Sequence, residues 1–83
     1  MKWGAVVDVL YAEDDALVLT DTELFRLSLV GRLIIEACEH GSSRDEIIAF
    51  LIAELGPPPG GSVEDAVDEV LGELLRAGVV VDA

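Results

Sequence analysis

This sequence has few of the residues that build most catalytic and metal sites. It contains one cysteine, Cys38, and one histidine, His40. A single cysteine excludes an internal disulfide and a cysteine-rich zinc site. A single histidine cannot supply the several nitrogen ligands of a histidine-rich metal site. It is also the one candidate base for a serine–histidine–acid relay. We therefore expect no resident metal, no cofactor, no catalytic residue and no enzymatic activity.

Basic residues are also scarce. Five lysines and arginines face seventeen aspartates and glutamates, which gives a formal net charge of -12. Nucleic-acid affinity comes largely from cations that displace counterions from the phosphates, so a chain this acidic should be repelled by DNA and RNA. The same argument disfavours an anionic membrane surface. We expect neither a nucleic-acid partner nor a membrane partner.

Long hydrophobic runs are missing as well. The longest, IIAFLIA, has seven residues, whereas a membrane-spanning helix needs about 20. The N-terminal segment carries an acid, Asp8, within its apolar stretch and lacks a cleavage signal, so we expect a cytoplasmic protein. What the chain does have is 52% hydrophobic residues in a length of 83, which predicts one small folded domain spanning residues 1–83.

The first 27 residues have the period of two that is typical of strands. We expect an antiparallel meander with strands at about 3–13, 16–20 and 23–27, joined by an acidic turn and by the turn Thr-Asp-Thr. In the first strand, alternation would place on one face the side chains of Trp3, Ala5, Val7, Val9 and Tyr11. In the third strand, Phe25 should point away from the face that carries Leu24 and Arg26.

After Leu27 the period changes to about 3.6, which predicts helices at about 29–40, 44–55 and 63–77. Serines mark the three starts: Ser28 and Ser62 are expected N-caps, and Ser43 with Glu46 forms a capping-box pattern. The sequence PPPGG between the last two helices predicts a stiff linker with a flexible end.

The lone cysteine and histidine have structural explanations in this arrangement. Cys38 falls on the apolar stripe of the first helix, so we expect a buried and inert thiol. His40 would lie in the last turn of that helix, where an imidazole favourably meets the negative end of the helix dipole.

The third helix is apolar over about half of its circumference, wider than the ~100° stripe that one core contact requires. Its apolar residues are Val63, Ala66, Val67, Val70, Leu71, Leu74 and Leu75. Either this helix is central to a small core, or part of its apolar face is reserved for a partner.

The order of elements predicts a small α+β, winged-helix-like domain in which a three-stranded antiparallel sheet is followed by three helices. In that order the motifs ALVL, FRLS, VGRLIIEA, HGSSRDEI and VLGELLRAGVV resemble those of the PqqD-like proteins, also called RiPP precursor peptide recognition elements. The resemblance covers about residues 16–81.

This resemblance implies a non-catalytic adaptor. Such domains bind the leader segment of a ribosomally made precursor peptide and deliver the peptide to a modifying enzyme such as a protease, cyclase or radical enzyme. The leader would lie as an added antiparallel strand along the third strand, in a groove shared with the third helix. The implied peptide-binding residues are Glu23, Leu24, Phe25, Arg26 and Leu27 on the strand and Val67, Val70, Leu71 and Leu74 on the helix.

Two other functions remain open from the sequence. A dimerisation or structural module could use the same open strand edge to pair with a second copy and form a homodimer. A winged-helix regulator has the right number of elements, but this chain lacks the basic recognition helix that DNA binding requires.

Overall fold

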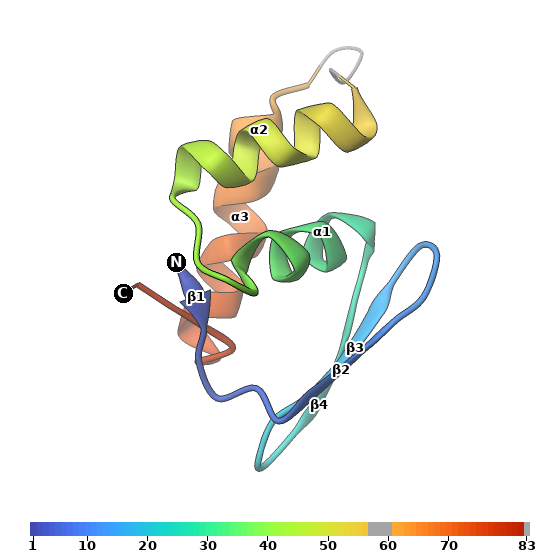
Figure 1. Cartoon of the computed structure of the whole chain (residues 1–83), viewed down its shortest axis with the longest axis vertical. Coiled ribbons are helices and arrows are strands. Elements are labelled where there is room, and N and C mark those ends of the chain that lie inside the picture. The colour runs from blue at the N-terminus through green and yellow to red at the C-terminus, as the bar shows by residue number, and fades with distance from the viewer. Residues whose placement is uncertain (57–60, 83) are drawn as a thin grey trace.

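A computed structural model describes residues 1–56 and 61–82, and within these ranges it contains three helices, a three-stranded sheet and a second sheet of two short strands (Figure 1). In chain order the elements are β1 (Lys2–Trp3), β2 (Asp8–Tyr11), β3 (Ala16–Leu19), β4 (Leu24–Leu27), α1 (Leu29–Cys38), α2 (Arg44–Leu55), α3 (Val63–Arg76) and β5 (Val80–Val81). The expected α+β order, with an antiparallel three-stranded sheet before three helices, is confirmed.

The three-stranded sheet is a meander in the order β2-β3-β4. A tight turn joins β3 to β4, and Thr20 organises it. Its backbone N–H donates to the Glu23 carbonyl at 2.9 Å, and its hydroxyl accepts from the Glu23 N–H at 3.1 Å. Threonine side chains close turns in this way because the hydroxyl can replace a backbone partner. The turn therefore fixes where β4 begins.

The prediction of one strand over residues 3–13 is wrong, because the segment is divided between two sheets. Gly4 and Ala5 donate backbone hydrogen bonds to Val79 and Gly78 near the C-terminus, at 2.8 and 3.0 Å. A Cβ on Gly4 would lie 2.5 Å from the Gly78 carbonyl oxygen, so only glycine permits this approach.

The break between β1 and β2 also changes which side chains face inward. Val6 and Val9 pack against the core, whereas Val7, which strict alternation placed on the same face as Val9, is 60% exposed. Alternation holds only while a strand continues, so the predicted face of this segment is wrong at Val7.

The C-terminal valines form a strand that the sequence pattern did not predict. In β5, Val80 and Val81 pair antiparallel with Trp3 and Lys2 of β1. The indole nitrogen of Trp3 in turn donates to the Ile35 carbonyl of α1 at 2.7 Å. Figure 1 shows the N- and C-termini side by side as a result, with this small sheet holding both ends against the helices.

Helix boundaries agree with the sequence where a serine cap is present. Ser43 and Glu46 make both bonds of the expected capping box, at 2.9 and 3.1 Å, and α2 has the bounds that were predicted. Ser62 caps α3 by accepting from the Asp65 N–H at 3.3 Å. Of the predicted proline-glycine linker, residues 57–60 lie outside the described residues.

The first helix begins at the predicted residue, Leu29, but ends earlier than predicted. Ser28 occupies the N-cap position, but within the described chain its side chain makes no capping bond. The helix ends at Cys38, so His40 lies beyond the last turn instead of within it. The early ending follows from Gly41, which has a φ of +89°, and from Ser42, whose hydroxyl donates to the Ala37 carbonyl at 2.6 Å.

The core lies between α1, α2, α3 and the inner face of the sheet. Cys38 is fully buried there, as expected, and burial raises the pKa of its thiol. The fully buried larger side chains are Val18, Ile34, Ile35, Ile47, Leu51, Val67, Val79 and Val80. None of the helices within residues 1–56 and 61–82 has the length and apolar character that a membrane crossing requires.

One ion pair between α2 and α3 should make stability depend on pH. Arg44 donates two hydrogen bonds to the carboxylate of Asp68, at 2.7 and 2.8 Å, and this holds the pKa of Asp68 below its ordinary value of 3.8. A carboxyl with a lowered pKa stabilises the fold above its ordinary pKa, and this contribution is lost as pH falls through the folded pKa. We expect Asp68→Asn to melt below the wild type at pH 6 but together with it well below pH 3.8, in paired melting curves. A gap that persists unchanged in acid would contradict this assignment.

Candidate functional site

The outer border of the sheet at β4 is open. β4 pairs with β3 in the register Val18 to Phe25 and Leu19 to Leu24, and among the described residues no strand lies on its other side. In Figure 1 the strands of this sheet run together diagonally below α1, and α2 lies at the opposite end of the view. An open strand edge presents unpaired backbone groups, so this border is the natural place for another strand to add.

The register identifies the backbone groups that face this border. In an antiparallel pair, residues alternate between those that bond to the partner strand and those whose backbone groups point away from it. The Thr20 N–H bonds to the Glu23 carbonyl, so Phe25 and Leu27 are the β4 residues that bond to β3. The N–H and C=O groups of Leu24 and Arg26 therefore point to the open edge.

The side chains of β4 divide between two environments. Phe25 and Leu27 pack against the core, whereas Leu24 is 63% exposed and Arg26 is exposed beside Asp15, with 3.0 Å between Nε and the carboxylate. The expectation that Phe25 points away from Leu24 and Arg26 is confirmed. Glu23, the fifth residue predicted on this strand, lies one residue before β4, and its carbonyl is bonded to Thr20.

The α3 residues predicted for the site lie mostly in the core. Val67, Leu71 and Leu74 are buried, and only Val70 of the predicted set is half-buried with accessible surface. The wide apolar arc of this helix is thus buried at its centre and more accessible at both borders. One border carries Val63, Ala66 and Val70, and the other carries Leu75. That this helix forms a groove with β4 stays a prediction.

Gly31 allows α1 to pack tightly on β4, and the sequence motifs did not single out this role. The glycine is buried, and a Cβ built on it would lie 2.9 Å from the Cβ of Leu27. A contact that short is not accommodated without moving one of the two elements, since the Leu27 atom is close to the backbone. The absence of a side chain at Gly31 therefore sets how the open edge sits relative to α1.

We expect the two helical glycines to respond oppositely to alanine. Gly72→Ala should stabilise α3 by about 0.5–1 kcal/mol, because alanine has the higher helix propensity and a Cβ there would lie 3.5 Å from a flexible arginine tip. Gly31→Ala gains the same helix propensity, but its new Cβ would push α1 away from Leu27. We therefore expect its free energy of unfolding to fall by about 1–2 kcal/mol. Chemical denaturation of both variants checks this. Equal stabilisation of both would show that the α1–β4 contact is loose.

A hollow of about 340 Å³ lies at the C-terminal end of β4. Its lining residues are both charged and apolar: Asp14, Asp15, Arg26, Leu27, Ser28 and Leu29. A strand added antiparallel along β4 would reach this hollow with its N-terminal end, since antiparallel neighbours run in opposite directions. Sequence reasoning interpreted Asp14 and Asp15 only as turn residues, because their closeness to Arg26 depends on how β3 and β4 pair.

The single histidine and the single cysteine, the side chains best suited to act as a base or a nucleophile, do not belong to this edge. His40 is exposed after α1, and Cys38 is buried as a thiol of raised pKa. Within the described ranges, no three histidine, cysteine or acidic side chains gather closely enough to hold a metal ion. What the arrangement around β4 offers is a row of backbone donors and acceptors next to a hollow of mixed charged and apolar lining.

Comparisons with known proteins identify a family and a solved structure of similar fold. The family model described as "Coenzyme PQQ synthesis protein D (PqqD)" matches residues 9–80 of the chain. Among solved structures, the fold is similar to "TbiB1 in Complex with the TbiA(beta) Leader Peptide", with a TM-score of 0.74 and 24% sequence identity over 95% of this chain and 93% of that one. A search of curated proteins found no significant match.

Proposed function

Because the chain belongs to the PqqD family, we propose that it is an adaptor that binds the leader segment of a ribosomally synthesised precursor peptide and delivers that peptide to a modifying enzyme. The structurally similar TbiB1, whose fold this chain shares, was solved with a leader peptide. In this role the chain binds and presents its peptide without catalysing a reaction, and it acts in the cytoplasm, where precursor peptides are made.

One observation carries the proposal. The edge of β4 offers two backbone donors and two acceptors, from Leu24 and Arg26, that have no strand partner among the described residues. A peptide strand that adds there gains backbone hydrogen bonds whatever its sequence, and it gains selectivity from the surfaces that its alternate side chains meet. An unprotected edge of this kind would otherwise favour aggregation.

The position of β4 determines which surfaces those side chains meet. Side chains on one face of the added strand would point to the helix side, beside Phe25 and Leu27. The residues at the N-terminal end of the peptide segment would reach the hollow next to Ser28. On the helix side, Val70 at the border of the α3 arc is the predicted α3 residue with surface to contribute.

Fluorescence anisotropy with the two halves of a precursor peptide tests the proposal. The probes are the N-terminal leader half and the C-terminal core half of a candidate precursor peptide, each carrying a dye. We expect one-to-one binding of the leader half and weak or no binding of the core half. Equal binding of both halves, or of neither, would overturn the proposal. A dimer whose formation competes with the leader would instead assign the edge to a second copy.

A further inference from the structure

The side of the sheet that faces away from the helices is unusually apolar. We call Leu10, Leu17, Leu19 and Leu24 the outer leucine face. The register places these residues together, because Leu10 pairs with Leu17 and Leu19 pairs with Leu24. Leu10 is 66% exposed and Leu19 is 42% exposed. Strands that are apolar on both faces are normally covered on both, yet within the described chain the helices cover only the inner face.

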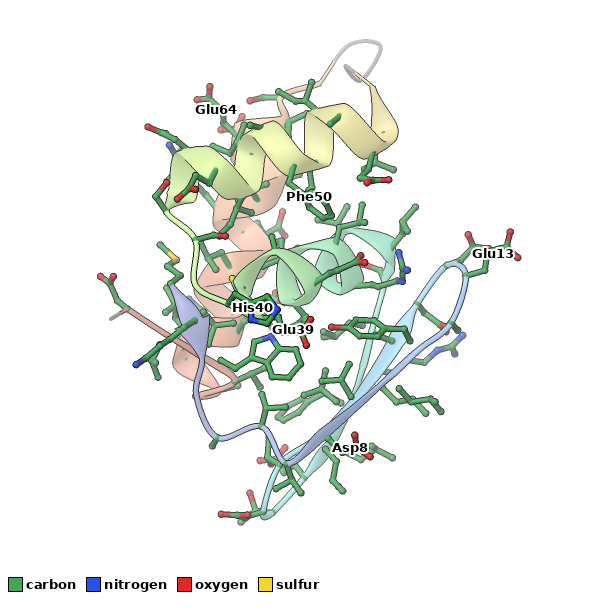
Figure 2. All side chains as sticks on the ribbon, in the orientation of Figure 1. Asp8, Glu13, Glu39, His40, Phe50 and Glu64 are labelled. Atoms are coloured by element: carbon green, nitrogen blue, oxygen red, sulfur yellow. The ribbon has the colours of Figure 1, made fainter. Side chains whose placement is uncertain are left out.

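The outer leucine face is hollowed as well as apolar. A depression of about 200 Å³ is lined by its four leucines and by Asp8. In Figure 2, Asp8 lies on the side of the sheet turned away from the helices. Scattered single leucines on a surface need no explanation, but a contiguous apolar depression is typical of a contact site for another molecule.

The charge of the segment that forms the sheet indicates what kind of molecule would cover the outer leucine face. Between Gly4 and Ser28 the chain has six carboxylates and a single basic residue, Arg26, which is already paired with Asp15. Of these carboxylates, Asp8 lines the depression itself. A second copy would bring the same acidic segment, with its own Asp8, to the contact, at a cost in repulsion. A protein surface with an apolar centre and a rim of lysine and arginine would be complementary to this face.

The outer leucine face is continuous with the peptide edge. Leu24 contributes its side chain to the face while its backbone groups point to the open edge of β4. A strand bound at that edge would extend the sheet by one strand, and every second side chain of the peptide would join the outer leucine face. A partner on this face would therefore contact both the domain and the bound peptide.

We propose that the outer leucine face docks a second protein of complementary chemistry, apolar at its centre and basic at its rim, and that this protein is the modifying enzyme. The identity of the partner rests on the proposed function, whereas the surface is distinct from the backbone edge that takes the leader. The sheet then has two uses: the edge of β4 holds the peptide, and the outer leucine face holds the enzyme that acts on it.

A double variant, Leu10→Thr with Leu19→Thr, tests this docking. Threonine suits strands and both leucines are well exposed, so the fold should be retained. The control is Ile52→Gln with Leu55→Gln, which removes two similarly exposed apolar side chains from α2. The probes are the dye-labelled leader and a purified enzyme that modifies the same precursor peptide. We expect the double variant to bind leader as the wild type does but to bind the enzyme about tenfold or more weakly. The control should bind both normally, and added salt should weaken enzyme binding to the wild type.

The outcomes separate the two proposals. Unchanged enzyme affinity in a double variant that still binds leader would overturn docking on the outer leucine face and leave the proposed function intact. If the wild-type protein does not bind the leader, the proposed function is overturned. The effect of the variants on enzyme affinity would still decide whether the outer leucine face is the docking surface. Sedimentation velocity adds a third outcome: a wild-type dimer that the double variant abolishes would assign the face to a second copy and overturn the inference.

Discussion

Replacing Leu24 by proline should weaken leader binding strongly and leave the domain folded. Proline removes the backbone N–H and places its ring where the added strand must approach. At this position the N–H faces the open edge instead of β3, so the β3–β4 ladder keeps its hydrogen bonds. Arg26→Pro should act in the same way, because its backbone has the same orientation. We expect affinity to fall about tenfold or more for either variant, from the lost bond and the steric obstruction together.

The matched control is Leu24→Ala, which shortens the same exposed side chain but keeps the backbone donor. It should retain most of the affinity if backbone pairing dominates. Circular dichroism and melting curves establish that each variant is folded, and anisotropy with the labelled leader measures binding. A folded Leu24→Pro variant with wild-type affinity would place the peptide elsewhere on the molecule.

Replacing single apolar side chains of α3 by alanine should distinguish residues that stabilise the core from residues that bind the peptide. Leu71 and Leu74 are buried in the core, so Leu71→Ala and Leu74→Ala should each cost about 2–5 kcal/mol. A small domain is stable by only about 5–15 kcal/mol, so these variants should show the largest losses of melting temperature. Val70→Ala should cost much less stability, because Val70 is only half-buried at the border of the arc.

Leader affinity gives the second measurement of this series. If the border with Val70 faces the peptide, Val70→Ala should weaken leader binding by more than its small loss of stability explains. Leu75→Ala, on the opposite border of the arc, is the matched control and should leave binding unchanged. Proportional losses of stability and binding across every variant would mean that α3 serves only as core, and that selectivity is determined on β4 and in the hollow beside it.

Local patterns predicted the elements whose boundaries depend on local interactions. The capping box of Ser43 and Glu46 involves neighbours in sequence, and the helix that it starts has the predicted bounds. The strand predicted at 23–27 is observed as Leu24–Leu27, because the turn that positions it is closed by Thr20, only a few residues away. These interactions are short in range, so a single sequence contains the information to predict them.

Long-range contacts caused the errors. Nothing near Gly4 in the sequence indicates that it approaches Gly78, yet that contact divides the predicted first strand. For α3, the width of the apolar arc was visible, but which part of it is buried depends on where α1 and α2 pack. The outer leucine face had a local signal, since the strand Ala16–Leu19 is apolar on both faces, and this signal predicts a covered sheet.

Amide hydrogen exchange, followed residue by residue by NMR with and without the leader half of the precursor, tests the central claim most directly. In the free protein the Leu24 and Arg26 amides should exchange quickly, because they face the open edge, whereas the Phe25 amide should be protected by its bond to β3. Saturating leader should slow exchange at Leu24 and Arg26 and change Phe25 little. Leader binding that leaves the Leu24 and Arg26 amides as fast as in the free protein would contradict the account.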